Sequence, residues 1–345
     1  MTRRSMLAQS ILFALRDGYL DRCIEMIDEQ TSSGEVSAAA IAVRHQDSVS
    51  QHAFGKAKTA DAVFLIASIT KPMTATALMT LVDRGEVSLS DPVQRFIPEF
   101  RGEGRELVLI KHLLTHTSGL PDMLPEDQEL RKRHAPLAEF VERTCRTPLL
   151  FKPGSELRYQ SMGILLAADI VSRVTKAFLP SFLSHQVFRP LDMSNTSLGL
   201  GGRAISQTMQ CQVAHASDWD WNSSYWRNLG SPWGGAHSTV GDLTRFLQYF
   251  AHPDRRILKP ATAAAMVTNQ TGGLNKRWGI GWMLNNGQFG NGCSTAAFGH
   301  SGSTGTLCWL DPKKDLSFVL LTTRPAAQSN STLLYPVSEC VSAVD

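Results

Sequence analysis

The sequence predicts an α+β fold: one antiparallel sheet assembled from both ends of the chain and flanked by helices, with a helical lobe inserted between its strands. Strand-like apolar runs lie near the N-terminus and again beyond residue 278, whereas residues 85–231 are mostly helical in pattern, punctuated by proline and glycine. The 345 residues are many for a single core, so two lobes that share a cleft are expected. We expect residues 1–67 and 235–345 to form the sheet lobe and residues 68–234 the helical lobe, with a functional site in the cleft between them.

The first elements are a helix and a hairpin. The N-terminal residues up to about Glu29 predict an amphipathic helix, and a turn follows at 32–34 (SSG). Residues 36–43 are small and apolar, as in a buried strand, and residues 47–57 alternate enough to be its hairpin partner.

The middle and the end of the chain complete the two lobes. Helices are expected at 110–115, 137–144, 163–175, 178–187 and 239–250. Ser238 is a plausible N-cap for the last of these, with Asp242 in its first turns. Short strands separated by turn residues are expected at 278–284, 295–299, 305–310 and 316–322, and a closing helix at 332–343.

The composition excludes several classes of protein. Hydrophobic residues make up 43% and charged residues 19%, which is typical of a soluble globular chain. The net charge of +3 and the absence of a basic run interleaved with aromatic residues predict no nucleic-acid partner. The six cysteines form no C-x-x-C pair, which argues against a zinc ribbon or a disulfide scaffold.

The sequence also predicts where in the cell the protein is located. No stretch is long enough to cross a membrane, and the basic N-terminal segment is interrupted by Gln9 and Ser10 and lacks a clear cleavage site. We therefore expect a cytoplasmic protein without a membrane span, a metal or a cofactor, and its oligomeric state stays open.

Ser68 and Lys71 form the main candidate for chemistry. A serine three positions before a lysine lies one helical turn from it, so the two side chains can share a face. An unprotonated amine at that distance can take the proton of the hydroxyl and make it nucleophilic. The pair follows an apolar run at 63–67 and begins a long helical pattern, and Pro72 indicates a helix start near Ser68 because proline is tolerated only in a first turn.

Two distant segments could complete a site around this serine. Tyr159 precedes the helix expected at 163–175, and a phenol can pass a proton between nucleophile and leaving group if a neighbouring cation lowers its pKa. His300, Ser301 and Gly302 follow the strand expected at 295–299. A small or glycine-rich edge there lets backbone N–H groups approach a substrate.

With these segments the chain resembles the serine β-lactamase and penicillin-binding-protein superfamily. It is most similar to the class C-like branch, which includes family VIII carboxylesterases and D-alanyl-D-alanine carboxypeptidases of the HxG type. The likeness runs from about residue 36 onward. It rests on four ordered segments besides the S-x-x-K motif: 113–120 (LLTHTSGL), 159–163 (YQSMG), 234–243 (GGAHSTVGDL) and 298–305 (FGHSGSTG).

The resemblance implies a β-lactamase/transpeptidase-like fold and a role for each matching residue. Ser68 would be the acylated nucleophile, Lys71 its activating partner and Tyr159 the second general base. The opposite wall would be formed by His300, Ser301 and Gly302, and the N–H groups of Ser68 and Ser303 would form an oxyanion hole.

The chain departs from the family pattern at two positions. Many relatives have asparagine at the position of Ser161, and a hydroxyl cannot offer the two donors of that amide. Many β-lactamases have lysine at the position of His300, and a mostly neutral imidazole would hold a substrate carboxylate less well. Both departures favour an ester or a small amide over a lactam as substrate.

Other motifs have simpler interpretations. His112 and His116 have the spacing of metal ligands on a helix but lack a third ligand, so structural roles are favoured. The aromatic stretch at 219–233 is interpreted either as packing between lobe and sheet or as one wall of an acyl pocket for bulky apolar groups.

Three functions follow, in order of preference. The first is a serine hydrolase that works through an acyl-enzyme, acting as a carboxylesterase on small or apolar esters. The second keeps the chemistry with another substrate: a D-alanyl-D-alanine carboxypeptidase, a D-aminopeptidase or a weak β-lactamase. The third is a non-catalytic scaffold with the same fold.

Overall fold

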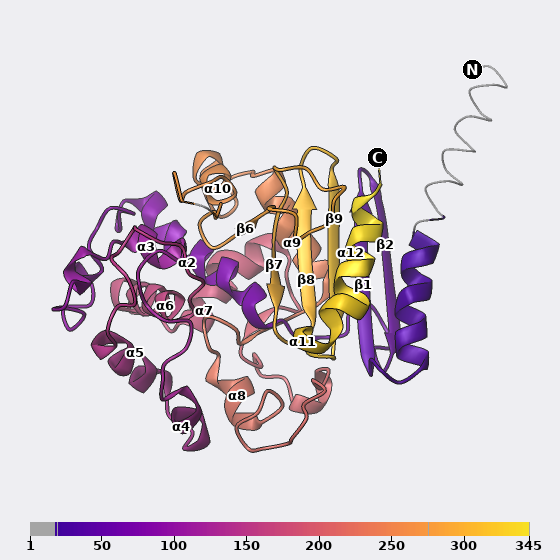
Figure 1. The fold of residues 1–345 in the computed structure, drawn as a ribbon, viewed down its shortest axis with the longest axis horizontal. Coiled ribbons are helices and arrows are strands. Elements are labelled where there is room, and N and C mark those ends of the chain that lie inside the picture. Colours follow the sequence, from indigo (N-terminus) through magenta and orange to yellow (C-terminus); the bar gives the residue numbers. More distant parts are fainter. Residues whose placement is uncertain (1–17, 19, 275, 345) are drawn as a thin grey trace.

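Both ends of the chain contribute strands to one antiparallel sheet with the order β2-β1-β9-β8-β7-β6 (Figure 1). The computed structural model describes residues 18, 20–274 and 276–344. The strands are β1 (Ala38–His45), β2 (Ser48–Gly55), β6 (Met283–Leu284), β7 (Phe298–Gly302), β8 (Thr306–Asp311) and β9 (Leu316–Thr322). Pairing of β1 with β9, in which Ile41 lies opposite Leu320, joins the two ends of the chain. The expected sheet is therefore confirmed.

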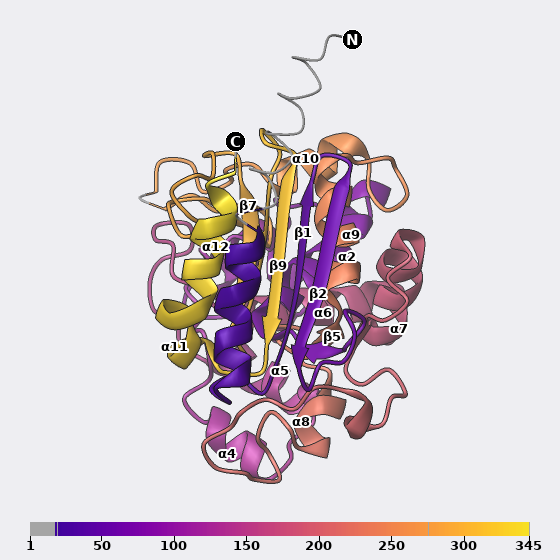
Figure 2. The ribbon, with the colours of Figure 1, turned by 90° about the vertical axis from the view of Figure 1, so that its right-hand side faces the viewer.

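The two faces of the sheet are covered by different helices because successive strand residues point to opposite faces. In β1, Ala39, Ile41 and Val43 pack with the helix formed by residues 20–32 and with α12 (Tyr335–Ser342). Figure 2 shows these two helices side by side across the outer face of the sheet. Ala38, Ala40 and Ala42 belong to the larger core on the other face, which contains α9 (Val240–Ala251). The part of the N-terminal helix expected at residues 1–17 lies outside the described residues.

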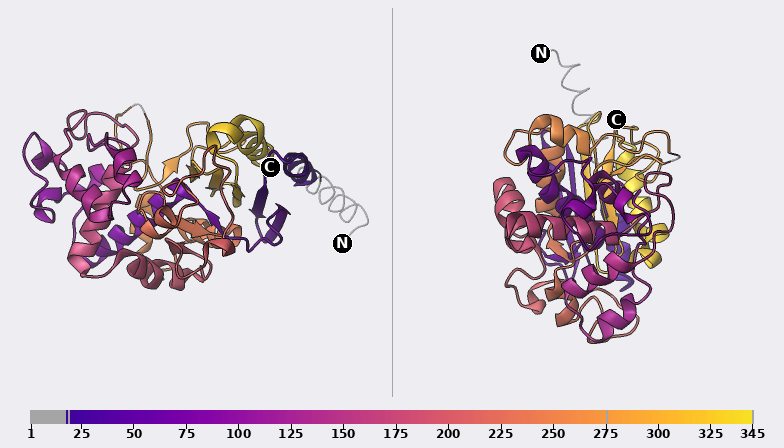
Figure 3. Two further views of the ribbon diagram at one scale, coloured as in Figure 1. Left: turned by 90° about the horizontal axis from the view of Figure 1, so that it is seen from below. Right: turned by 90° about the vertical axis from the view of Figure 1, so that its left-hand side faces the viewer.

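The helical lobe lies on the far side of α9 from the terminal helices (Figure 3). Its helices are α2 (Thr70–Arg84), α3 (Ile110–Leu114), α4 (Asp127–Lys132), α5 (Leu137–Arg146), α6 (Met162–Thr175), α7 (Leu179–Leu183) and α8 (Ser224–Leu229). Buried α2 and α6 pack together and form its centre. The helix α10 (Pro260–Met266) follows α9. The lobe boundaries at 67/68 and 234/235 stay a prediction.

A small second sheet leads into the residues around Ser68. It has the order β3-β5-β4 and consists of β3 (Phe64–Leu65), β4 (Ser197–Leu198) and β5 (Ala236–Ser238). After β3 the chain forms a 3₁₀ turn at Ala67–Ile69 and continues directly into α2. Ala67 has φ +45°, a conformation that costs a residue with a Cβ roughly 1–3 kcal/mol. Ser68 is thus held in a strained turn at the start of a buried helix.

Strand β7 approaches this turn so closely that only glycine fits at its end. A Cβ added to Gly302 would lie 2.4 Å from the Ile66 carbonyl oxygen and 2.3 Å from the Thr306 hydroxyl. The contact is reinforced from the next segment, since the hydroxyls of Thr304 and Thr306 donate to the carbonyl oxygens of Leu65 (2.7 Å) and Ile66 (3.1 Å). The position of the Ser68 turn against the large sheet is therefore fixed by backbone contacts.

The structure corrects several expected boundaries. Only Met283–Leu284 of the strand expected at 278–284 is extended, and β7 begins at Phe298, so His300, Ser301 and Gly302 lie within the strand. The N-cap of α9 is Thr239 and not Ser238, because the Thr239 hydroxyl accepts the Asp242 N–H. The helices expected at 178–187 and 332–343 each contain a π-helical turn, at Ser184–Phe188 and Asn330–Leu334.

We expect Gly302→Ala to lower the free energy of unfolding by about 2 kcal/mol or more, since the added methyl group forces β7 away from the Ser68 turn. Denaturant unfolding measures the change. Gly273→Ala is the matched control, because a Cβ there meets no atom within 4 Å, and it should change stability by less than about 0.5 kcal/mol. Equal stability of the two variants would contradict the close approach.

Candidate active site

Ser68 and Lys71 face each other as their spacing predicts. The Lys71 ammonium nitrogen Nζ lies 3.0 Å from the Ser68 Oγ and donates a second hydrogen bond to the Trp233 carbonyl oxygen, also at 3.0 Å. Lys71 itself is fully buried in α2. A flexible side chain is thereby held in one position by two hydrogen bonds and by the packing around its stem.

Burial lowers the pKa of the Lys71 amine far enough that it can act as a base near neutral pH. Loss of solvation disfavours its charged form and lowers its pKa to about 7, while the negative charge of Asp122 opposes the shift. An amine with this pKa is unprotonated in about half of the molecules at pH 7. Lys71 can therefore accept the Ser68 proton, which a solvated lysine could not.

The Tyr159 phenol completes this group from the loop before α6. Lys71 Nζ lies 4.7 Å from the centre of the Tyr159 ring, over its face. Burial raises the pKa of the phenol well above its usual value, and its side-chain hydrogen bond with Ser68 offsets only part of the shift. The neighbouring cation therefore does not lower the phenol pKa below normal, contrary to the condition considered from the sequence. In the resting protein Tyr159 carries its proton.

The His116 ring packs against the ring of Tyr159. The two rings lie 4.7 Å apart, and the His116 Nδ1 accepts the backbone N–H of Gln160 at 3.2 Å. The Gln160 side chain is fixed in turn by the Ser118 hydroxyl (2.5 Å) and the His112 carbonyl oxygen (3.1 Å). His116 and His112, considered from the sequence as metal ligands, thus each hold backbone in place, since His112 Nδ1 accepts the Leu109 N–H.

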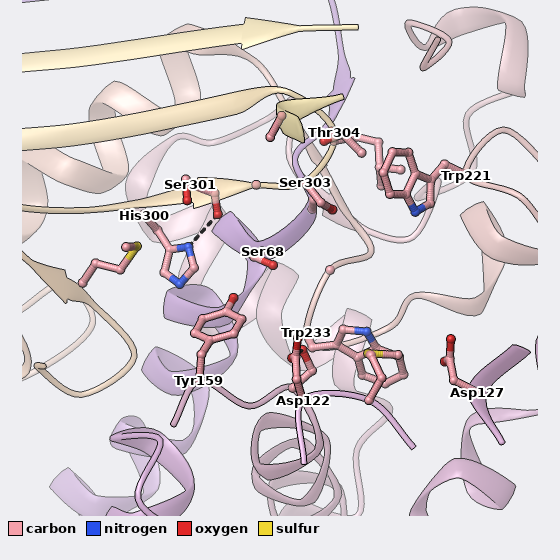
Figure 4. Close-up of a pocket in the computed structure, with 18 of the residues that line it drawn as sticks. Ser68, Asp122, Asp127, Tyr159, Trp221, Trp233, His300, Ser301, Ser303 and Thr304 are labelled. Carbon is pink, nitrogen blue, oxygen red and sulfur yellow. Dashed lines mark hydrogen bonds between the residues drawn. The ribbon is translucent and has the colours of Figure 1, made fainter. Parts of the chain in front are cut away.

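His300 forms the opposite wall from β7. Its Nδ1 lies 2.7 Å from the Ser301 carbonyl oxygen, which can only accept, so Nδ1 carries the proton and Nε2 is the free acceptor. Burial and the nearby Lys71 lower the pKa of the imidazole to about 3. His300 is therefore neutral, as the sequence argument assumed. Ser303 lines the same cavity opposite Ser68 (Figure 4).

The Ser161 hydroxyl is hydrogen-bonded to the carboxylate of Asp122, a residue that the sequence analysis did not identify as part of the site. The Ser161 Oγ donates to Asp122 Oδ1 at 2.6 Å, and the Ser161 backbone N–H donates to the Asp122 carbonyl oxygen at 3.1 Å. Trp278 was also missed: its ring lies 4.7 Å from that of His116 and 6.1 Å from that of His300. Neither residue belongs to a motif, so no local signal marked them.

One cavity of about 600 Å³ is bordered by Ser68, Asp122, Tyr159, Ser161, Trp278 and His300. Its floor contains Ser68 and Tyr159, and one wall is formed by the end of β7 from His300 to Gly302 and by Ser303 just after it (Figure 4). Three tryptophans of the aromatic stretch, Trp221, Trp226 and Trp233, line it as well. The other two aromatic residues pack outside it: Tyr225 donates to the Ala135 carbonyl oxygen, and Trp219 lies against Arg131. The cavity is thus largely apolar, with Ser68 at its floor.

Comparison with known proteins decides the family. The Beta-lactamase family model matches residues 20–336, nearly the whole chain. The chain belongs to the beta-lactamase family. Esterase EstB of Burkholderia gladioli is 37% identical over 180 residues, which cover 46% of each protein. A putative D-alanyl-D-alanine carboxypeptidase of Escherichia coli K12 is 23% identical over 362 residues, or 89% of this chain and 82% of the relative.

The solved structures agree on the fold of this beta-lactamase-family protein. EstCE1, described as a hydrolase with promiscuous acyltransferase activity, superposes with a TM-score of 0.78 at 20% identity, over 95% of this chain and 99% of its own. The β-lactamase/transpeptidase-like fold expected from the sequence is confirmed. In the part of the chain that the structure describes, no helix has the length and apolar character needed to cross a bilayer.

The buried amine of this beta-lactamase-family protein should destabilise it in a pH-dependent way. Above about pH 10.5, the ordinary pKa of lysine, Lys71 is neutral in both the folded and the unfolded chain and burial carries no charge penalty. As the pH falls to about 7, the unfolded chain gains a proton that the folded one does not, and stability is lost over that interval. Below about pH 7 the full penalty is present.

We therefore expect the difference in stability between Lys71→Met and the parent to shift in favour of the variant between pH 10 and pH 7. The change is a few kcal/mol, because each unit of pKa corresponds to about 1.4 kcal/mol. Denaturant unfolding of both proteins at several pH values measures it, and groups common to both cancel. A difference independent of pH would mean that Lys71 has an ordinary pKa.

Proposed function

We propose that the protein is a serine hydrolase that works through an acyl-enzyme, and that its substrates are small or apolar carboxylic esters. The observation that carries the proposal is the 3.0 Å contact between the Ser68 hydroxyl and a buried amine whose pKa lies near 7. A serine so placed can be deprotonated as it attacks a carbonyl carbon.

Acylation then proceeds in two steps. Lys71 takes the Ser68 proton while Oγ forms a bond to the ester carbonyl carbon, and the carbonyl electron pair moves to oxygen. The N–H groups of Ser68 and Ser303 would stabilise that oxyanion. As the carbon–oxygen bond to the alcohol breaks, the leaving oxygen receives the phenol proton of Tyr159, which the Lys71 ammonium replenishes.

Deacylation reverses the proton path. Water replaces the alcohol, and its proton passes to the Tyr159–Lys71 pair as its oxygen attacks the acyl carbon. Collapse of the second tetrahedral species breaks the bond to Ser68 Oγ and returns a proton to it. Tyr159, buried against His116 and Trp278, is held for this exchange.

Two features favour an ester over a β-lactam. His300 is a buried neutral imidazole, so the β7 wall offers no positive charge to a substrate carboxylate. The Ser161 hydroxyl is already donated to Asp122 and cannot orient a substrate amide carbonyl. The similarity to esterase EstB agrees with this choice.

A D-alanyl-D-alanine carboxypeptidase or D-aminopeptidase is the second candidate. It is favoured by the Escherichia coli relative, whose similarity extends over 89% of this chain.

A substrate panel separates these functions. We expect a p-nitrophenyl ester series to be hydrolysed faster than nitrocefin or a peptide ending in D-Ala-D-Ala, and Ser68→Ala to abolish turnover. The exposed Ser88→Ala is the matched control and should keep full activity. A fluorophosphonate should add its mass to the parent and to Ser88→Ala but not to Ser68→Ala. Equal rates for Ser68→Ala and the parent would refute the nucleophile, and a faster peptide rate would make the second candidate correct.

The pH dependence of kcat/KM should reflect the protonation of Lys71. Because protonated Lys71 cannot accept the serine proton, kcat/KM for a p-nitrophenyl ester should fall below an apparent pKa of about 7. Lys71→Arg, whose guanidinium stays protonated, should lose on the order of 10²–10⁴ in kcat/KM. A parent profile that is flat between about pH 5 and pH 8 would exclude Lys71 as the base.

A further inference from the structure

One side of the cavity presents only hydrogen-bond acceptors. The single proton of the Ser161 hydroxyl is donated to Asp122 Oδ1 at 2.6 Å, so a substrate meets the lone pairs of Ser161 and the carboxylate of Asp122. A carbonyl oxygen placed there would find no donor in this pair. A substrate group that fits this side must itself donate.

The Asp122 carboxylate acts on the charge of Lys71, but the Lys71 ammonium is hydrogen-bonded to Ser68 and to the Trp233 carbonyl oxygen and does not contact Asp122 as an ion pair. Asp127, the other acidic residue that lines the cavity, lies 3.7 Å from the Arg131 guanidinium. Asp122, which is exposed at the cavity, forms no ion pair within 4 Å with any residue that the structure describes. Figure 4 draws it below Ser68, among the residues that line the same cavity. Its negative charge is therefore available to a bound molecule.

A second acceptor lies unpartnered on the opposite wall. His300 is 1% exposed and lines the cavity, and its Nε2 is buried with no hydrogen-bond partner among the described residues. Because the protein covers this nitrogen, the acceptors open to a substrate are those of Ser161 and Asp122. The basic group in the cavity, Arg131, is already engaged, since it is paired with Asp127 and lies 4.0 Å from the centre of the Trp226 ring.

From these contacts we infer that the acyl part of the preferred substrate carries an ammonium group close to the scissile carbonyl, and that Asp122, held by Ser161, binds it. The substrates would then be esters of amino acids with a free amino group. Trp221 and Trp233 line the same space and suit both an apolar side chain and a cation, because tryptophan faces attract positive charge. The inference rests on the proposed esterase function and adds a specificity-determining residue to it.

Two isosteric substrates test the inference: the methyl ester of phenylalanine, in each enantiomer, and the methyl ester of 3-phenylpropanoic acid, which lacks only the amino group. At pH 7 most α-amino groups, with pKa values of about 7.7–8.0, are protonated. The readout is the ratio of kcat/KM for the amino ester to that for the neutral ester, which cancels changes common to both.

We expect Asp122→Asn to lower this ratio by about tenfold for the preferred enantiomer, in the range of a charged hydrogen bond. The matched control is Asp127→Asn, an acid in the same cavity that is already paired, and it should change the ratio by no more than about twofold. Salt should reduce the ratio in the parent, because the attraction at this exposed carboxylate is screened. A ratio that survives Asp122→Asn, or that falls equally in Asp127→Asn, overturns the inference.

Binding to Ser68→Ala separates failure of this inference from failure of the proposed function. Titration calorimetry with the same two esters gives their Kd values in Ser68→Ala and in the double variant that also contains Asp122→Asn. If neither ester is hydrolysed but the amino ester binds more tightly only with Asp122 present, the esterase proposal falls and the ammonium site stands. If both esters are hydrolysed and bound without regard to Asp122, the esterase proposal stands and the ammonium site falls.

Discussion

The burial of one amine governs the chemistry of this protein. Lys71 lies wholly inside the helical lobe, and among the described residues its hydrogen bonds go to Ser68 and to the Trp233 backbone. In water its amine would be protonated at neutral pH and useless as a base. The dry surroundings that lower its pKa also oppose folding, so the apolar packing of α2 against α6 offsets a cost that arises at the reacting group itself.

The parts of the site come from segments that only the complete fold brings together. Ser68 and Lys71 lie at the start of α2, Tyr159 before α6, and His300 in β7. The close approach of Gly302 to the Ile66 carbonyl fixes the distance between the sheet and the strained turn. The β7 wall is therefore held against the Ser68 turn by this close approach and by the hydroxyls of Thr304 and Thr306.

Much of the fold and the centre of the site could be predicted from the sequence because their signals are local. The Ser68–Lys71 spacing and Pro72 mark the start of a helix, and the small apolar run at 36–43 followed by the alternation at 47–57 marks a hairpin. Strand ends were less predictable: Gly281 has φ +77°, which is not extended backbone, so the strand expected at 278–284 is interrupted before Met283 and Trp278 bridges back to Met283. Asp122 could not be predicted as a site residue, because a lone acidic residue in a loop carries no sequence signal. Only the fold brings it within 2.6 Å of the Ser161 hydroxyl.

The pairing of β1 with β9 has a consequence for how the chain is made. His45 lies opposite Leu316, so about 270 residues must be synthesised after the first hairpin before its inner strand finds its neighbour. At typical ribosome speeds that takes roughly 15–55 seconds. Throughout this interval the backbone N–H and C=O groups on the β9 side of β1 are open to pairing with other chains. At high levels of synthesis this unpaired edge is therefore a site where nascent chains pair with one another.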